Sequence, residues 1–438
     1  MSLNQTAVSF LENCRWEALP EKVQHQAKRC LLDALGSLIA GYETPVGKLM
    51  ENIAGVQFPG DQAAVLVSGT RLSAAGAALA NGFCANALDI DDGYRPTKGH
   101  PGACVLPPAL VAAQMSGCSG RELLAALVAG YELGTRAGII RHATYETYHS
   151  SGSWGAVAGA GVAGKLLGLD RDQLCHAMGA AEYHAPIAPM MKCIDVPGMG
   201  KDSIGWGCMV GVLSAAMAQA GFTGIHPLYE DAPDADIVNS LGRDWEIMNL
   251  YFKPYSACRW AQPGVDGALK LVGEHGISPA DIERITVYTF EESAALSTAH
   301  PQNTEEAQYN IAFPIAAAVL DGEVGPRQNL PPRLLDADIR ELMDRISIVP
   351  EQRFQIDFPQ RAESEVEIAT RQGTVVRSGV MGARWDAWCP PTDQELMDKF
   401  LWLTEPVLGM DKSAALARVI WQLEENETLD RFFDLCRR

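Results

Sequence analysis

The segment 88–102 holds the densest group of chemically active side chains in the sequence. It reads LDIDDGYRPTKGHPG and contains three carboxylates, two cations and one imidazole. Side chains of these types transfer protons and bind charged substrates near neutral pH. Because they stand between two Ala-rich stretches that are expected to be buried helices, they need partners or a function. A polar loop on a rigid scaffold is a typical active site, and a solvated turn between helices is the plainer alternative.

Within this loop, His100 follows Asp89 across a stretch that Pro96 and Pro101 stiffen. A carboxylate that is hydrogen-bonded to an imidazole fixes the tautomer of the ring and raises its basicity. We therefore expect Asp89, or else Asp92, to position a catalytic base at His100 rather than to bind a metal.

Further polar groups interrupt apolar helical sequence elsewhere in the chain. They add imidazoles that titrate near neutral pH and several cations, but few acids. Such a set suits the removal of a C–H proton next to a carboxylate, because the cations can bind the carboxylates of the substrate. A single His or Lys of this kind is more often structural, so the hypothesis depends on their convergence in one pocket. The groups are Arg141-His142, Tyr148-His149, Lys192, Lys201, and Lys253-Pro254-Tyr255 with Arg259.

A glycine-rich segment, GAGVAGK at 159–165, matches two phosphate-binding patterns, GxGxxG and GxxxxGK. The second pattern needs Ser or Thr at the next position, which is Leu166 here. Both patterns also need a buried strand directly before them, and the residues before Gly159 do not form one. The sequence therefore predicts a glycine-packed helix and no nucleotide cofactor.

Metal-ligand spacings are missing from the sequence. Nine His and eleven Cys form no HExxH motif, no CxxC pair and no calcium loop. The acids of the loop, together with His100, could chelate a cation, and this is the weaker alternative. We therefore expect no metal and no other cofactor.

Composition limits the partners that the chain can have. The net charge of −19 argues against nucleic acid and against anionic membrane surfaces as partners. No apolar run reaches the length of a membrane span, and the first residues do not resemble a secretory signal. Scattered, unpaired cysteines fit a reducing compartment. We expect a cytoplasmic protein with a small-molecule substrate, no nucleic acid and no membrane.

Residues 1 to about 267 are expected to form one helix after another. The apolar spacing after Pro20 predicts a helix that ends at Gly41. Helix starts are indicated by the pair Ser119 and Glu122, by Asp170 with Gln173, and near Ser203. Many Ala and Gly residues in this region predict close helix packing.

The pattern changes after about residue 268. Alternating residues at 285–290 predict a strand, and 366–370 with 374–378 predict a hairpin around Gln372-Gly373. We therefore predict a helical domain over 1–267 and an α+β lid domain over 268–391. A last helical stretch from Thr392, over 392–438, is expected to complete the helical domain.

Short motifs follow one another along nearly the whole chain. In their order and spacing they resemble the signature of the MmgE/PrpD family, which includes 2-methylcitrate dehydratase, cis-aconitate decarboxylase and iminodisuccinate epimerase. The motifs are Asp89-Ile90-Asp91-Asp92 with His100-Pro101-Gly102, Gly130-Tyr131-Glu132, Lys165-Leu166-Leu167-Gly168-Leu169, Gly221-Phe222-Thr223-Gly224, Lys253-Pro254-Tyr255, Ala307-Gln308-Tyr309-Asn310 and Leu320-Asp321-Gly322.

The resemblance implies a mainly α fold, with an all-helical main domain and a smaller α+β lid domain. It also implies a homodimer and a cofactor-free pocket between the domains. At matching positions it implies catalytic roles for Asp89, His100, His149 and Lys201, and substrate binding by Lys253 and Tyr309. As further substrate-binding candidates we take Asp92, Arg259 and Tyr148, which belong to the polar groups described above.

These residues predict acid–base chemistry next to a carboxylate. Lys201 and Lys253 would stabilise the charge that builds on the carboxylate oxygens. Either His100 or His149 would act as the base, with the other imidazole or a Tyr as the acid. One departure bears on this hypothesis: Gly93 stands where family members that dehydrate or decarboxylate often carry Thr.

The first functional hypothesis is a lyase that acts on a small di- or tricarboxylate, a hydro-lyase of the 2-methylcitrate dehydratase type. The alternatives are an epimerase or racemase of an amino- or imino-dicarboxylate, and a decarboxylase of the cis-aconitate type. A carboxylate-binding protein without catalytic activity is a further alternative.

Overall fold

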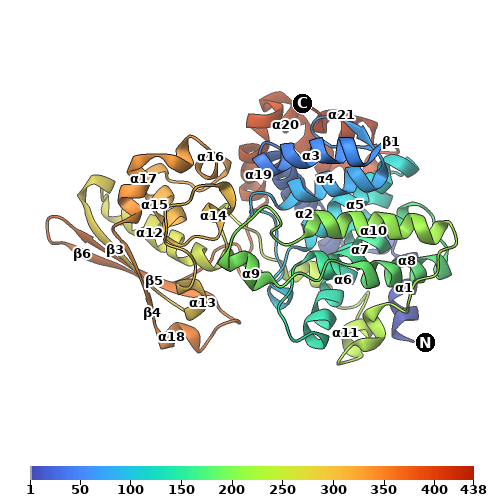
Figure 1. Cartoon of the computed structure of the whole chain (residues 1–438), viewed down its shortest axis with the longest axis horizontal. Coiled ribbons are helices and arrows are strands. Elements are labelled where there is room, and N and C mark those ends of the chain that lie inside the picture. The colour runs from blue at the N-terminus through green and yellow to red at the C-terminus, as the bar shows by residue number, and fades with distance from the viewer. Residues whose placement is uncertain (1) are drawn as a thin grey trace.

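Two lobes lie side by side in the computed structural model, which describes residues 2–438 (Figure 1). The larger lobe is built mainly from helices of the first 250 residues and from the last three helices of the chain. Its helices are α1 (Leu3–Asn13), α2 (Glu21–Gly41), α3 (Pro45–Gln57), α4 (Ala74–Asn86), α5 (Pro101–Ser116), α6 (Gly120–Thr144), α7 (Gly152–Leu166), α8 (Arg171–His184), α9 (Met190–Asp195), α10 (Ile204–Gln219), α11 (Asp236–Asn239), α19 (Asp393–Leu408), α20 (Met410–Trp421) and α21 (Asp430–Cys436).

The smaller lobe combines short helices with a mixed sheet of four strands. The strand order is β4-β3-β5-β6, in which β3 pairs parallel with β4 and antiparallel with β5. Its elements are α12 (Gln262–His275), β3 (Ile282–Thr289), α13 (Glu291–Ala294), α14 (Thr304–Gln308), α15 (Ala312–Asp321), α16 (Pro326–Asn329), α17 (Ala337–Met343), β4 (Ile346–Pro350), α18 (Gln352–Gln355), β5 (Glu363–Thr370) and β6 (Val375–Gly382).

The predicted fold class is confirmed: the protein is mainly α, with a smaller α+β region. The larger lobe is not entirely helical, however, because β1 (Pro59–Ala64) pairs with β2 (Arg71–Leu72). This two-stranded ribbon is too short and too polar to give a clear alternating pattern in the sequence.

Local sequence signals account for the helix starts. Ser119 and Glu122 form the predicted capping box of α6, and Asp170 with Gln173 forms that of α8. The side chain of Thr392 caps α19 in the same way. The predicted hairpin is also present, since β5 and β6 pair around Gly373, whose φ is 82°.

The glycine-rich segment 159–165 lies inside α7 and continues that helix. A Cβ at Gly211 of α10 would lie 2.9 Å from the carbonyl oxygen of Ala156 and from the nitrogen of Ala160, so α7 and α10 pack backbone against backbone. The segment is therefore a helix-packing surface, as the sequence predicted.

The buried apolar side chains form one large cluster in each lobe. The first cluster contains residues up to Phe252 and resumes at Leu396, so the last helices pack on the larger lobe. The second cluster contains residues from Tyr255 to Ile368, together with Met190 of α9. A boundary at residue 267 would fall inside α12, and we infer that it lies near 253–254 instead.

One helix, α6, is long and apolar enough to cross a membrane by length and composition. Within its most apolar window, 94% of the residues are buried inside the protein, as is typical of a central core helix.

Candidate active site

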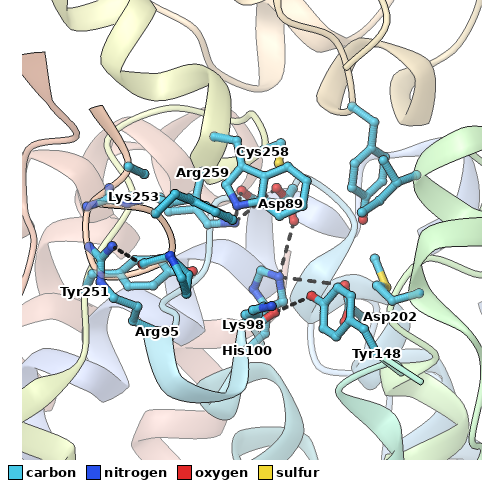
Figure 2. A pocket seen from close by; sticks show the side chains of 17 residues that line it. Asp89, Arg95, Lys98, His100, Tyr148, Asp202, Tyr251, Lys253, Cys258 and Arg259 are labelled. Atoms are coloured by element: carbon cyan, nitrogen blue, oxygen red, sulfur yellow. Dashed lines mark hydrogen bonds and ion pairs between the residues drawn. The ribbon is translucent and has the colours of Figure 1, made fainter. Parts of the chain in front are cut away.

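A pocket with a cavity volume of about 80 Å³ lies where the two lobes meet, and a position between lobes is typical of small-molecule sites. Figure 2 shows its side chains, which come from the loop 88–102, from segments near 148 and 202, from 251–260 and from the smaller lobe. The lining residues are Asp89, Arg95, Lys98, His100, Tyr148, Met190, Ile194, Asp202, Tyr251, Lys253, Cys258, Arg259, Trp260, Tyr309, Phe358, Pro359 and Ala362.

Asp89 is the centre of the charged part of this pocket. Its carboxylate lies 3.0 Å from Nζ of Lys253, 3.7 Å from Nζ of Lys201 and 3.5 Å from Nε2 of His100. Burial alone would raise the pKa of Asp89, but the attraction of Lys253, Lys201 and His100 outweighs it and lowers the pKa to about 2. Asp89 is therefore a carboxylate at any working pH.

His100 lies among three carboxylates. Its Nδ1 is 3.0 Å from Asp91, and its Nε2 faces Asp89 and Asp202, the latter at 3.8 Å. Burial acts to lower the pKa of the imidazole, but the attraction of Asp91 and Asp202 raises it above its ordinary value. The raised pKa favours the protonated ring and a role as proton donor, which is one of the two roles that the sequence analysis allowed for His100.

Two residues of the loop and one of the lysines beside it have a strained backbone. Asp89, Lys98 and Lys201 have φ angles of 52°, 49° and 38°, and they are three of the five non-glycine residues with positive φ in residues 2–438. This conformation costs about 1–3 kcal/mol per residue and persists where the surroundings impose it. Lys201 is held by the carbonyl of Asn86 at 2.5 Å and by Oε1 of Gln308 at 2.6 Å.

Four residues with hydroxyl or thiol groups line the pocket, namely Tyr148, Tyr251, Cys258 and Tyr309. The hydroxyl of Tyr148 donates to the carbonyl of Lys98 at 2.7 Å. The hydroxyl of Tyr309 is buried without a hydrogen-bond partner in the described residues, and Nζ of Lys201 lies 6.0 Å from the centre of its ring. Burial raises the pKa of the Cys258 thiol to about 12, so this thiol is not a nucleophile at neutral pH.

The structure brings together Asp89, His100, Lys201 and Lys253, but not His149. The imidazole of His149 is buried outside the pocket lining; its Nδ1 lies 2.7 Å from the hydroxyl of Ser153, and its ring stacks on His142 at 4.5 Å. Burial lowers the pKa of His149. The sequence placed an imidazole at this position but could not show which way the ring turns.

Asp92 also lies away from the pocket lining. Its carboxyl accepts from the backbone nitrogen of Gly102 at 2.8 Å and from the hydroxyl of Tyr131 at 2.6 Å. Burial and the nearby charge of Asp33 raise the pKa of Asp92 to about 7. Its contacts anchor the loop on α5 and α6. Asp92 therefore supports the loop and does not line the pocket, where the predicted contact with substrate would be made.

Arg259 lines the pocket, but its terminal nitrogens are occupied. They donate to the carbonyls of Phe252, Ala383 and Arg384 and to the carboxylate of Asp386. These contacts tie the two lobes together and leave no terminal nitrogen for the substrate carboxylate that the sequence predicted. Within the described residues, Lys98 lines the pocket without an ion pair, whereas the terminal nitrogens of Arg95 contact Asp386 and the carbonyl of Pro359. The sequence analysis selected neither residue.

Two further acids of the site were missed in the sequence. Asp202 accepts from the backbone nitrogen and the hydroxyl of Ser151, and the same hydroxyl accepts from the backbone nitrogen of His100. Asp91 accepts from the side-chain amide of Asn86 at 2.9 Å. Asp202 directly follows Lys201, and this KD pair was the only local signal for it.

Comparison with protein families matches residues 5–247 to the MmgE/PrpD N-terminal domain and residues 255–425 to the MmgE/PrpD C-terminal domain. A cis-aconitate decarboxylase-like protein, oryM of Aspergillus oryzae, is 24% identical over 97% of this chain and 96% of its own length. The cis-aconitate decarboxylase of Aspergillus terreus is 24% identical over 71% of this chain and 71% of its own length.

Proposed function

The chain belongs to the MmgE/PrpD family, and on that premise we propose that it is a cofactor-independent lyase acting on a small di- or tricarboxylate. One observation carries the proposal: Lys201, Lys253 and the imidazole of His100 surround the carboxylate of Asp89 at a pocket between the lobes, and Lys253 and His100 line that pocket. A substrate carboxylate next to the reacting carbon gains charge as a proton or CO2 leaves, and these cations stabilise that charge.

Loss of CO2 is the first candidate reaction. When the bond to the leaving carboxylate breaks, its electron pair stays on the substrate carbon, and a proton donor must then supply a proton. His100 is charged and sits at the pocket, while Lys253 stays protonated because the charge of Asp89 raises its pKa. A decarboxylation needs such donors and no separate base. Both related proteins described above are named cis-aconitate decarboxylases or decarboxylase-like.

Loss of water from a 2-methylcitrate-type substrate is the second candidate. A dehydration needs a base for the C–H proton as well as an acid for the leaving hydroxyl. The carboxylate of Asp202 is the candidate for this base, because it lines the pocket and lies 3.8 Å from Nε2 of His100, which would be the acid. An epimerase with two opposed imidazoles finds less support, since His100 is the only His among the lining residues.

A substrate screen tests this proposal. The purified chain is incubated with cis-aconitate, 2-methylcitrate, citrate and the two enantiomers of aspartate, with and without EDTA, and the products are identified by mass and by chirality. We expect loss of CO2 or water from a tricarboxylate, with no effect of EDTA. Inversion of aspartate without a change in mass, or activity that requires a divalent ion, would contradict the proposal.

We further propose a cytoplasmic homodimer. The outer face of α10 exposes Trp206 and Leu213 to 45% and 44%, which is unusual for large apolar side chains on one helix and fits contact with a second copy. Light scattering after size exclusion should give twice the chain mass of 47.2 kDa. A monomer at micromolar concentration would contradict this proposal.

A further inference from the structure

Gly93 and Tyr251 form a short backbone bridge at the edge of the pocket. The nitrogen of Gly93 donates to the carbonyl of Tyr251 at 2.9 Å, and the nitrogen of Tyr251 donates back to the carbonyl of Gly93 at 2.9 Å. The bridge joins the loop 88–102 to the segment that carries Lys253. It therefore fixes where the side chain of Tyr251 can lie.

The phenol of Tyr251 fills the space beside Gly93. A Cβ built on Gly93 would lie 2.2 Å from Cζ and 2.3 Å from the hydroxyl oxygen of Tyr251. Atoms at that separation overlap, so any other residue at position 93 would displace the ring. The phenol of Tyr251 thus occupies the space that a side chain at position 93 would fill.

The ring of Tyr251 is held firmly, and its hydroxyl is free. The guanidinium of Arg259 lies 4.5 Å from the ring centre, and the backbone of Phe252 bonds to the carbonyl of Trp385. The residue is 7% exposed and lines the pocket, and its hydroxyl makes no hydrogen bond to other groups within residues 2–438. The hydroxyl oxygen therefore faces the pocket, where a bound ligand can accept its hydrogen.

The charges around Tyr251 show what kind of ligand group would bind there. The charges of Lys253, Arg259 and Arg95 act on the phenol, together with that of Asp89, and Asp386 pairs with both arginines. Figure 2 shows Tyr251 beside Arg95, at the end of the pocket away from Tyr148 and Asp202. Burial raises the pKa of Tyr251, so the phenol stays protonated and can donate a hydrogen bond.

We propose that Tyr251 contacts the substrate directly and donates its hydroxyl hydrogen to a second carboxylate, the one that does not take part in the reaction at His100. Gly93 is the residue that makes room for this phenol. Together they select substrates with two separated carboxylates over monocarboxylates. The inference rests on the proposed function and names one contact within the same site.

The test compares Tyr251→Phe with a matched control, Tyr229→Phe, which removes a buried hydroxyl that donates to the carbonyl of Leu133 outside the pocket. Binding of cis-aconitate and of the monocarboxylate crotonate is measured first by thermal shift, and kinetics follow on the best substrate of the wild type. Loss of a hydrogen bond to a charged group should lower kcat/KM about 10- to 100-fold, mainly through KM. The control variant should keep wild-type kinetics.

A second measurement tests the geometry without activity. Gly93→Ala should lower the urea midpoint of unfolding, and Tyr251→Ala should lower it as well. In the double variant the two losses should fall short of additive, because the ring that collides with Ala has been removed.

Each outcome separates the two proposals. If the wild type binds no polycarboxylate, the proposed function and this inference both fail. If the wild type binds and turns over a polycarboxylate but Tyr251→Phe matches it in KM and kcat/KM, only the inference fails. Additive losses in the Gly93 and Tyr251 variants would show that the ring does not occupy the space beside position 93, which also overturns the inference.

Discussion

Asp89, Asp91 and Asp202 balance the three cations that they surround. The cations are Lys201, Lys253 and the protonated His100. With both sets charged, the inner cluster is neutral before substrate enters. A polycarboxylate therefore needs cations beyond this cluster, and Lys98 and Arg95 are the side chains of that kind in the lining.

The first prediction at this scale concerns His100. Replacing it by Gln should lower turnover by at least ~100-fold, which is the low end of what one general acid–base residue supplies. Its raised pKa extends the protonated form to higher pH than in a free imidazole, and wild-type activity should fall as pH rises through that pKa. Turnover on the identified substrate checks both statements. His275→Gln, at the exposed end of α12, serves as control, and equal turnover of the two variants would contradict the role of His100.

A second prediction concerns the charge of Asp89. Asp89→Asn removes one of the carboxylates that hold His100 protonated, so the pKa of the imidazole should fall. The alkaline limb of the pH–rate profile should then move to lower pH, and turnover at pH 8 should drop more than turnover at pH 6. A profile that keeps its shape and only loses amplitude would show that Asp89 does not control the proton on His100.

A third prediction uses the raised pKa of Asp92. The folded protein holds this proton up to a pKa of about 7, whereas an unfolded Asp loses it near 3.9. The folded state binds more protons over this window, so the free energy of unfolding should fall as pH rises from about 4 to about 7 and then level off. Asp92→Asn removes the titration; its Oδ1 still accepts from the backbone nitrogen of Gly102, while its Nδ2 donates to the Tyr131 oxygen in place of accepting from it. Urea unfolding at pH 5 and pH 8 should show a smaller difference in this variant, and an equal difference would contradict the raised pKa.

At the scale of elements, the loop 88–102 depends on helices that are distant in sequence. Nζ of Lys399 in α19 lies 2.5 Å from Asp33 in α2 and 2.6 Å from the carbonyl of Ile90 in the loop. All of these groups are buried. Helix α19 therefore holds the acidic part of the loop in place.

A prediction at this scale follows from that contact. Lys399→Met leaves Asp33 buried and unpaired, and breaking a buried pair in this way costs about 3–5 kcal/mol. Urea unfolding measures this loss. The double variant Lys399→Met with Asp33→Leu replaces both charges by apolar groups and should recover most of the stability. A double variant as unstable as the single one would show that the pair is not what holds the loop.

Periodicity and capping motifs were sufficient to predict several helices, such as α2, α6, α8 and α19, because those signals are local. Ser119 with Glu122, for example, fixes the start of α6 within four residues. The contacts of the site are not local: Lys253 meets Asp89 across 164 residues. The spacing of polar residues could not show that Arg259 would use its terminal nitrogens on carbonyls, or that His149 would turn toward Ser153. Side-chain direction in a packed core depends on neighbours from the whole chain.

At the scale of the whole molecule, the two lobes are joined next to the pocket. Asp386, in the segment between β6 and α19, binds Arg95 of the loop and Arg259 of the opposite wall. Arg95 also donates to the carbonyl of Pro359 in the smaller lobe at 3.3 Å. These contacts fix the position of the smaller lobe over the site.

The prediction at this scale is that Asp386→Asn loosens the junction. Without the carboxylate, Arg95 and Arg259 lose their shared partner, and KM and kcat should change together, as is typical of residues that control closure. Hydrogen exchange should become faster in segments 93–99 and 358–362 and stay unchanged in α6. Protection unchanged in both segments would show that Asp386 does not hold the lobes together.

The contact between Lys399 and the loop also bears on how the protein is made. Synthesis runs from the N-terminus, and the helices of the first 250 residues leave the ribosome long before α19. Until then, Asp33 lacks its ammonium partner and the carbonyl of Ile90 lacks its donor, which follows 309 residues later. The nascent chain can collapse early but cannot complete the contacts of the loop 88–102 until residue 399 has been synthesised. A ribosome that stalls before residue 399 would release an inert product.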